Sequence, residues 1–317
     1  MLEPFLMTFE KMAQLILFVA LGYGCNRLKL IPHAAEQVMS LLVTLLLLPS
    51  LNLYTGIAEC RLDSLGQYGV VVLIGGVFCL LSIGLSYPTA RLFVKDNAYE
   101  QGVYRYALSI PNTGAVGTPL MLAFFGTAGL FQYSLFQFAA SVLTYSWGIA
   151  QLQPDHGKTS LWHNLKKCIN PAFVALVIGM LLGVLGAKVW MPAPVVNVLH
   201  DLSNCYVPMA LLMTGYALAD YPFGKVFGSL RVYLYTVWRL IAVPCIYLAV
   251  LLVFKAPLML ATMMAMTYTG PCGMNVVIYP AAYGEECPSG ASMVLISTLT
   301  SIVTVPLIYA LVQVFFA

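Results

Sequence analysis

Long apolar stretches constrain the fold of this chain more than any other feature of its sequence. A helix that crosses a bilayer needs about 20 mainly apolar residues, and the 317-residue sequence contains ten such stretches in succession. Inside a bilayer a segment has to satisfy its own backbone hydrogen bonds, so these stretches are predicted to be helices. We therefore predict an all-α polytopic membrane protein. The predicted transmembrane helices are residues 7–26, 34–57, 65–88, 98–125, 127–150, 169–188, 193–218, 226–253, 257–283 and 288–315.

The composition excludes other large classes of protein. Hydrophobic residues make up 61% of the chain and charged residues 9%, whereas a typical globular protein carries about 25% charged residues. Such a chain cannot cover the surface of a soluble particle, and its net charge of +3 is too small for a nucleic-acid interface. The eight cysteines are isolated and show neither zinc nor disulfide spacing, so we expect no metal and no cofactor.

One polar loop divides the chain almost in half. Residues 151–168 form the only extended polar segment, and we predict a single domain, residues 1–317, with halves 1–150 and 169–317. Lysine and arginine concentrate in cytoplasmic loops, and the loops after the odd-numbered spans carry eight of them against four on the other side. This bias predicts a cytoplasmic 151–168 loop and two extracytoplasmic termini in the cell (plasma or inner) membrane.

The two halves resemble each other at an offset of 160 residues. Prolines are rarer than Leu, Val or Ala and align less easily by accident, so the match indicates a duplication. Each half holds five predicted spans, and this odd number would insert the second copy upside down, as an inverted repeat. The aligned pairs include Pro32 with Pro192, Pro111 with Pro271, Ser141 with Ser301, Thr144 with Thr304 and, with one residue of slippage, Gly56 with Gly215.

The fourth predicted span of each half is interrupted by proline and glycine. The segments are SIPNTGAVGTPL, residues 109–120, and TGPCGMNVVIYP, residues 269–280. Proline removes a backbone donor and glycine lets the chain leave helical geometry. A break of this kind is tolerated in a membrane only where it faces protein or a watery cavity. Paired breaks at repeat-equivalent positions are typical of a transport site, although proline kinks with packing glycines are also common in membrane helices.

Each break would begin a new half-helix, whose free N–H groups carry a partial positive charge suited to an anion. Asn112, Thr113 and Asn275 would add polar side chains at the same depth. Arg105, Ser109 and Asn112 are four and three residues apart, so they are predicted to share one helix face. Arg105 is thus a candidate for charge compensation.

Two further charged residues, Arg239 and Asp201, are predicted to lie well inside transmembrane helices. Arg239 is near the middle of the span 226–253, where a charge costs at least about 2.5–3.5 kcal/mol. Two interpretations stay open: the arginine is satisfied by backbone carbonyls or by Asp201, or it compensates the charge of a bound anion. Asp201, in the span 193–218, is a candidate both for proton coupling and for a structural hydrogen-bond hub.

The sequence at the breaks resembles that of the auxin efflux carrier superfamily, which includes bacterial malonate and malate permeases beside the plant auxin exporters. The segments that carry the resemblance are NTGAVGTPLMLAFFG, residues 112–126, and PAAYGEECPSGASMVLISTLTSIVTVPLI, residues 280–308. The resemblance covers essentially the whole chain. The long central hydrophilic loop of the plant exporters is missing, which favours the bacterial permease type.

This resemblance implies ten helices in an inverted repeat, the fourth and ninth crossing at prolines in a domain that moves against a scaffold. Pro111 and Pro271 would be the crossover prolines. Asn112 and Asn275 would line the substrate site. A homodimer through the scaffold helices is also implied. The remaining predicted site residues are Asn52, Thr113, Gly114, Tyr145, Cys272 and Gly273.

The sequence thus predicts a secondary active transporter for a small organic anion, a mono- or dicarboxylate such as malonate or malate, working by elevator-like alternating access. H⁺ or Na⁺ coupling and uniport all stay open. A non-transporting sensor or a channel with a similar anion site is the alternative. An intramembrane enzyme would need a nucleophile–base pair, a metal motif or paired aspartates, and the sequence shows none of these within the spans.

Overall fold

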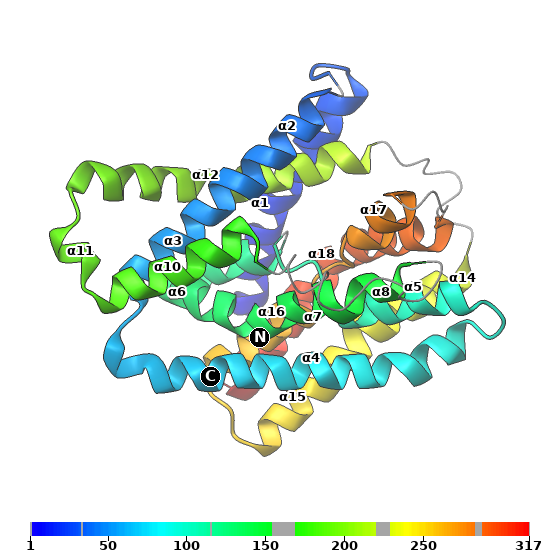
Figure 1. The fold of residues 1–317 in the computed structure, drawn as a ribbon. Helices are drawn as coiled ribbons and strands as arrows, with labels where there is room; N and C mark the ends of the chain where they lie inside the picture. The colour runs from blue at the N-terminus through cyan, green and yellow to red at the C-terminus, as the bar shows by residue number, and fades with distance from the viewer. Residues whose placement is uncertain are drawn as a thin grey trace.

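The computed structural model describes residues 2–32, 34–114, 116–153, 169–219, 229–282 and 287–316. Within these ranges the regular structure is helical, apart from one isolated β-bridge (Figure 1). Most of the predicted 151–168 loop lies outside the described residues. The first half contains α1 (Leu2–Arg27), α2 (Ala34–Leu42), α3 (Leu48–Glu59), α4 (Leu65–Phe93), α5 (Ala98–Ser109), α6 (Gly117–Phe136), α7 (Phe138–Leu143) and α8 (Ile149–Gln151).

The second half is also helical. Its described elements are α10 (Pro171–Val184), α11 (Ala187–Trp190), α12 (Ala193–Leu218), α14 (Leu230–Val237), α15 (Val243–Val253), α16 (Leu258–Tyr268), α17 (Asn275–Ala282) and α18 (Pro288–Phe316).

The predicted all-α membrane class is confirmed at the level of helix length and composition. Besides the five longer stretches given at the end of this paragraph, α10 and α16 are shorter apolar helices. The count of ten transmembrane spans stays a prediction. Gly126, with a left-handed φ of 63°, falls between the predicted spans 98–125 and 127–150. Among the described residues, five continuous stretches are long and apolar enough to cross a membrane: Ala34–Glu59, Leu62–Phe93, Gly117–Gln151, Leu230–Val253 and Ser289–Phe316.

In the described part of the chain, three helices contain a wider, π-helical turn. Two of these turns, Val43–Leu47 and Trp238–Ala242, come directly before Pro49 and Pro244. A proline ring clashes with the carbonyl group four residues earlier, which in both cases belongs to the π-helical turn, so the helix widens there. The third turn, Thr144–Gly148, has no such proline. Such turns often occur at functional sites.

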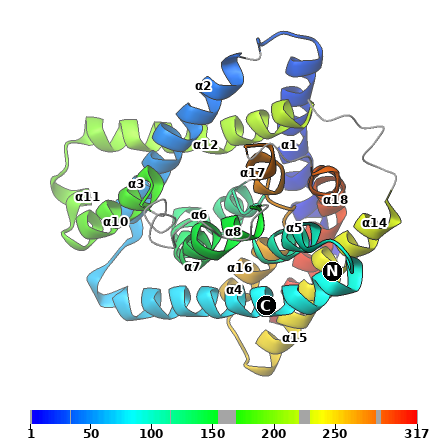
Figure 2. The same cartoon turned by 45° about the vertical axis from the view of Figure 1, so that its right-hand side comes forward.

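The helices pack in two groups. We call α1, α2, α3, α10, α11 and α12 the frame group, because α3 packs on α10 and α12, and α1 packs on α12. We call α4 to α8 and α14 to α18 the core group. The groups meet where α1 packs on α18 and α3 on α6. In both views α4 lies on one side and α2, α3, α10 and α12 on the other, with α6, α7 and α16 between them (Figures 1 and 2).

Glycines let the frame helices approach closely, at positions that the two halves share. A Cβ at Gly22 of α1 would lie 2.0 Å from the Leu212 carbonyl oxygen of α12. A Cβ at Gly183 of α10 would lie 2.4 Å from the Gly56 carbonyl oxygen of α3. Gly22 and Gly183 are related by the repeat offset with one residue of slippage. The two helix pairs thus use the same kind of contact, in which small residues bring backbones together.

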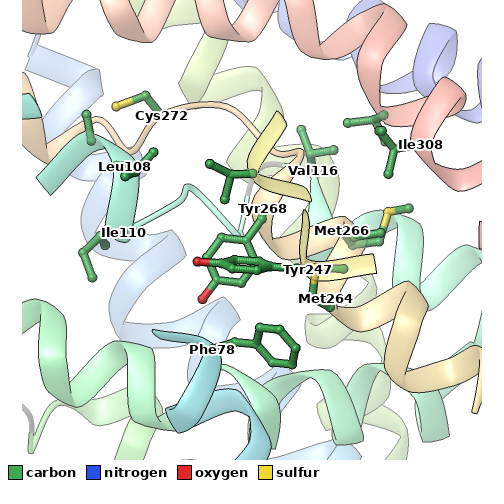
Figure 3. Packing of buried hydrophobic residues seen from close by; sticks show 14 of the residues in the cluster. Phe78, Leu108, Ile110, Val116, Tyr247, Met264, Met266, Tyr268, Cys272 and Ile308 are labelled. Atoms are coloured by element: carbon green, nitrogen blue, oxygen red, sulfur yellow. The ribbon is translucent and has the colours of Figure 1, made fainter. Parts of the chain in front are cut away.

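The core group is held by a large cluster of buried side chains around the second break. Tyr247 of α15 packs against Phe78 of α4 and Tyr268 of α16, with ring centroids 5.1 Å apart in both pairs (Figure 3). The Tyr247 hydroxyl also bonds with the Ser82 hydroxyl at 2.7 Å. The end of α16, where the second break starts, is therefore packed on both α4 and α15.

We expect Gly22→Ala to destabilise the protein by about 1–3 kcal/mol, the usual cost of forcing extra atoms into a packed interface. Gly24→Ala is the matched control on the same helix, because a Cβ there meets nothing within 4 Å. Thermal unfolding of the purified protein in detergent measures both. Equal unfolding temperatures for the two variants would contradict the glycine contact.

Candidate functional site

The two helix breaks meet in the structure. Pro111 and Cys272 pair as an antiparallel β-bridge, and the Asn112 N–H donates to the Pro271 carbonyl oxygen at 3.0 Å. Helices α5 and α16 end at this point, and α6 and α17 begin just beyond it. Segments about 160 residues apart in the sequence therefore form one contact, which we call the break contact.

Arg239 binds backbone carbonyl groups on both sides of the break contact. Its guanidinium donates to the carbonyl oxygens of Ala107 at 2.6 Å, Gly270 at 2.7 Å and Pro271 at 3.2 Å. The side chain is only 2% exposed. These carbonyls belong to the C-terminal ends of α5 and α16, where the helix dipole favours a positive charge. The arginine is therefore satisfied by backbone carbonyls.

The alternative pairing of Arg239 with Asp201 does not form. The Asp201 side chain is 80% exposed on α12, and its described contact is His200, whose Nδ1 lies 3.6 Å from Oδ1. Asp201 therefore lies apart from the break contact. Asp201 was the candidate for proton coupling, and the structure describes no contact between it and the rest of the site.

A polar cavity of about 480 Å³ lies beside the break contact, between the frame group and the core group. Both groups contribute to its wall: α3, α10 and α12 on one side, and the first break with α6 and α7 on the other. Of the predicted site residues, six line it together: Asn52, Pro111, Thr113, Gly114, Tyr145 and Asn275.

The N-terminal ends of three helices reach this cavity. Thr113 and Gly114 precede α6, Asn275 is the first residue of α17, and Asn170 caps α10 by accepting from the Phe173 N–H at 2.9 Å. The aligned peptide dipoles of a helix give its N-terminal end a partial positive charge. The cavity is therefore suited to a group with negative charge.

Two of the predicted site residues are fixed by hydrogen bonds. The Asn275 amide donates to the hydroxyl of the buried Tyr106 at 2.7 Å. The Asn52 amide donates to the Ala172 carbonyl oxygen, in the first turn of α10, at 2.9 Å. Tyr145 lies in the π-helical turn Thr144–Gly148. Asn275 and Asn52 thus present pre-positioned amide groups to the cavity from the two helix groups.

Gly117 lets a tyrosine approach the start of α6. A Cβ at Gly117 would lie 1.9 Å from the Tyr133 hydroxyl oxygen, so only glycine fits without movement of the ring. Tyr133 is buried and lines the cavity. Its hydroxyl therefore lies beside the same half-helix end that Thr113 and Gly114 precede.

Asn112 faces away from this cavity. The backbone before it is extended, with Ile110 at φ −115° and ψ 97°, and consecutive side chains of an extended chain point to opposite sides. Pro111 and Thr113 line the polar cavity, while Asn112, between them, lines a second, apolar cavity together with Pro271. The structure places Asn112 and Asn275 on opposite sides of the break contact.

Three further predicted site residues lie outside both cavity walls. Cys272 is buried, with its N–H donating to the Ser297 hydroxyl at 2.9 Å, and Gly273 follows it. Arg105 contacts Gln101 at 3.0 Å and Gln151 at 3.4 Å. The helix face predicted to join Arg105 to Asn112 does not exist, because α5 ends at Ser109.

The sequence prediction missed a polar stripe on the core side of the cavity. Ser134, Gln137, Ser141 and Thr144 all line it, and their spacing of three, four and three residues matches one face of a helix. This spacing was readable in the sequence. Asn170 and Tyr206 carry no comparable sequence signal, because they reach the cavity from α10 and α12 through the tertiary packing.

A known protein family matches the part of the chain that contains this site. A family model described as "Membrane transport protein" matches residues 7–309, a range that includes both breaks and every residue that lines the polar cavity. No curated protein sequence matches the chain significantly.

We expect Arg239→Met to destabilise the protein strongly. Hydrogen bonds from a charged donor are worth about 1.5–3 kcal/mol each, and three buried carbonyls would lose their bond to the guanidinium, although that of Pro271 would keep the Asn112 N–H. Arg239→Lys should recover only part of the lost stability. Its ammonium group keeps the positive charge but can reach fewer of the three carbonyls than the guanidinium does. Thermal unfolding in detergent measures the effect.

Arg231→Met is the matched control for this series. Arg231 precedes Arg239 by two turns and is half exposed, and its ion pair among the described residues is a 3.9 Å contact with Glu100, so we expect a change within about 0.5 kcal/mol. Similar unfolding temperatures for the Arg239→Met and Arg231→Met variants would contradict the role of Arg239 at the break contact.

Proposed function

The chain belongs to the membrane transport protein family, which is that of the auxin efflux carriers, and we propose that it is a secondary active transporter of a small organic anion. The observation that carries this proposal is the polar cavity at the break contact. Half-helix ends, the amides of Asn52 and Asn275 and the polar stripe of α6 and α7 converge on it. An anion held there would contact both helix groups.

A single carboxylate fits this cavity better than two. The described residues that line it include no lysine, arginine or histidine. The three helix ends that reach it, those of α6, α10 and α17, together supply about one and a half elementary charges, half from each helix dipole, which is enough for one carboxylate but not for two. Phe138 and Phe173, whose rings lie 5.4 Å apart, add an apolar part to the wall. Within the predicted mono- or dicarboxylates, of which malonate and malate are examples, we therefore favour a monocarboxylate.

The proposed mechanism is elevator-like alternating access. The core group, with the break contact, would carry the anion past the frame group. Three observations support this mechanism: the separation of the helices into two packed groups, the position of the cavity between them, and the repeat-related glycine contacts within the frame group. We propose that the halves 1–150 and 169–317 are inverted repeats, with ten spans and with the fourth and ninth helices crossing at Pro111 and Pro271.

The remaining proposals concern topology and partners. We propose a multi-pass protein of the cell membrane with both termini extracytoplasmic and the 151–168 loop in the cytoplasm. H⁺ and Na⁺ are the candidate coupling ions, and a homodimer through the frame group is the candidate assembly. A sensor with the same anion site remains the second candidate function; binding of an anion without counterflow would favour it over a carrier.

We expect Asn275→Ala to weaken anion binding about tenfold to hundredfold, because hydrogen bonds to charged groups are worth about 1.5–3 kcal/mol. Currents of the reconstituted protein on a solid-supported membrane, followed by isotope counterflow for electroneutral transport, measure this change. The anion panel would contain malonate, malate, lactate, succinate and indole-3-acetate.

Asn112→Ala is the matched control, because it removes the same side chain from the opposite side of the break contact and keeps the backbone bond to Pro271. We expect this variant to retain transport. Loss of transport in Asn112→Ala with retention in Asn275→Ala, both variants being folded, would contradict the assignment of the site to the polar cavity.

We also expect a preference for one carboxylate over two. The test compares acids of equal carbon number, propionate with malonate and butyrate with succinate, at a pH where all carboxylates are ionised. The monoacid of each pair should give the larger saturable current or the stronger competition. A consistent preference for the diacids would show that a second charge is compensated by groups other than the half-helix ends.

A further inference from the structure

A second cavity lies on the other side of the break contact. It has a volume of about 270 Å³ and is enclosed by α1 and α12 of the frame group and α18 of the core group. Asn112, Pro271 and Met274 form its inner end. Like the polar cavity, it therefore extends from the break contact outward between the two helix groups.

The repeat offset relates the two cavities. Ser141, Val142 and Phe138 line the polar cavity, and their partners 160 residues later, Ser301, Ile302 and Thr298, line the second one. Pro111 and Pro271 are related in the same way. The second cavity is thus the counterpart of the proposed anion site in the other half of the chain.

The chemistry of the second cavity is different. Its lining contains no charged side chain among the described residues, and its wall is almost entirely apolar. Thr214, Thr298 and Ser301 donate to carbonyl oxygens of their own helices, Ala210, Val294 and Thr298, at 2.8, 2.7 and 2.7 Å. Their hydroxyl hydrogens therefore point away from the cavity. A charged ligand would find no compensation along most of this wall.

The wall continues onto a surface suited to lipid. Leu299 lines the cavity and is also 47% exposed. Leu17, on the neighbouring stretch of α1, is 64% exposed, and Val303 of α18 is 57% exposed. In a membrane transport protein, exposed apolar side chains on long apolar helices contact hydrocarbon. The occupant with the best chemical match is therefore the hydrocarbon tail of a membrane lipid.

We propose that this cavity binds one acyl chain of a membrane phospholipid. The chain enters beside Leu299, between α1 and α18, and its tip reaches Met274 and Pro271 at the break contact. The headgroup stays at the membrane surface, because the cavity offers it no charged partner. A lipid held there contacts both helix groups and is placed to respond to any movement between them.

Photolabelling tests this proposal on the full-length protein. The protein is reconstituted in phosphatidylcholine vesicles that contain a trace of phosphatidylcholine with a diazirine at the end of one acyl chain. After irradiation, peptides are mapped by mass spectrometry. We expect labelling of Met274 and of the α1 and α18 residues that line the cavity, above the level on lipid-facing peptides such as those of α4.

Thr298→Phe is the deciding variant. It introduces the residue that the repeat-equivalent position, Phe138, already has, and it fills the cavity from α18. We expect loss of the label at Met274. Thr298→Val keeps the volume and should keep the label. Val303→Phe adds the same bulk outside the cavity and should also keep it.

Two outcomes would overturn the proposal: unchanged labelling of Met274 in Thr298→Phe, or wild-type labelling spread evenly over the lipid-facing surface. If Thr298→Phe does not fold, Ala20→Phe fills the same space from α1 and serves as the second variant. The readout is lipid contact rather than transport, so its result is independent of the proposed anion transport.

Discussion

The backbone N–H and C=O groups at the two helix breaks need hydrogen-bond partners, and the rest of the structure depends on which groups provide them. An unpaired N–H or C=O group away from water costs several kcal/mol. Here the Asn112 N–H uses the Pro271 carbonyl and the Cys272 N–H uses the Ser297 hydroxyl. Arg239 takes the carbonyls of Ala107, Gly270 and Pro271. Its positive charge neutralises the C-terminal ends of α5 and α16. The positive N-terminal ends of α6 and α17 are left for a ligand.

Prolines and glycines recur in the two halves at the offset of 160 residues, but the side chains that make the site differ. The position equivalent to Arg239 in the first half is Cys79, which is fully buried. One arginine is sufficient because the break contact brings the carbonyls of both halves within reach of a single forked guanidinium. The cavities differ in the same way. The prolines and the glycine contacts follow the repeat, whereas the polar stripe occurs on one side and a mainly apolar wall on the other.

Part of the site was predictable because its signals are local. The prolines and glycines of 109–120 and 269–280 marked both breaks, and Thr113 and Asn275 beside them do line one cavity. Asn52 and Tyr145, which the family resemblance implied, line it too. The side on which Asn112 lies was not predictable, because it depends on extended backbone at Ile110, where a helical face had been assumed. The partner of Arg239 was not predictable either: three carbonyls from two distant helices come together only in the fold.

The sequence by itself determined the membrane class, the approximate helix boundaries and the positions of the two breaks, because hydrophobicity, proline and glycine act on the residues close to them in the chain. The tertiary structure alone decided which break residues face which cavity, and that the space on one side is polar while its counterpart is apolar. These outcomes depend on contacts between helices far apart in sequence. No short pattern of residues encodes them, because a side chain's neighbours across a packed interface are set by where each helix crosses the next.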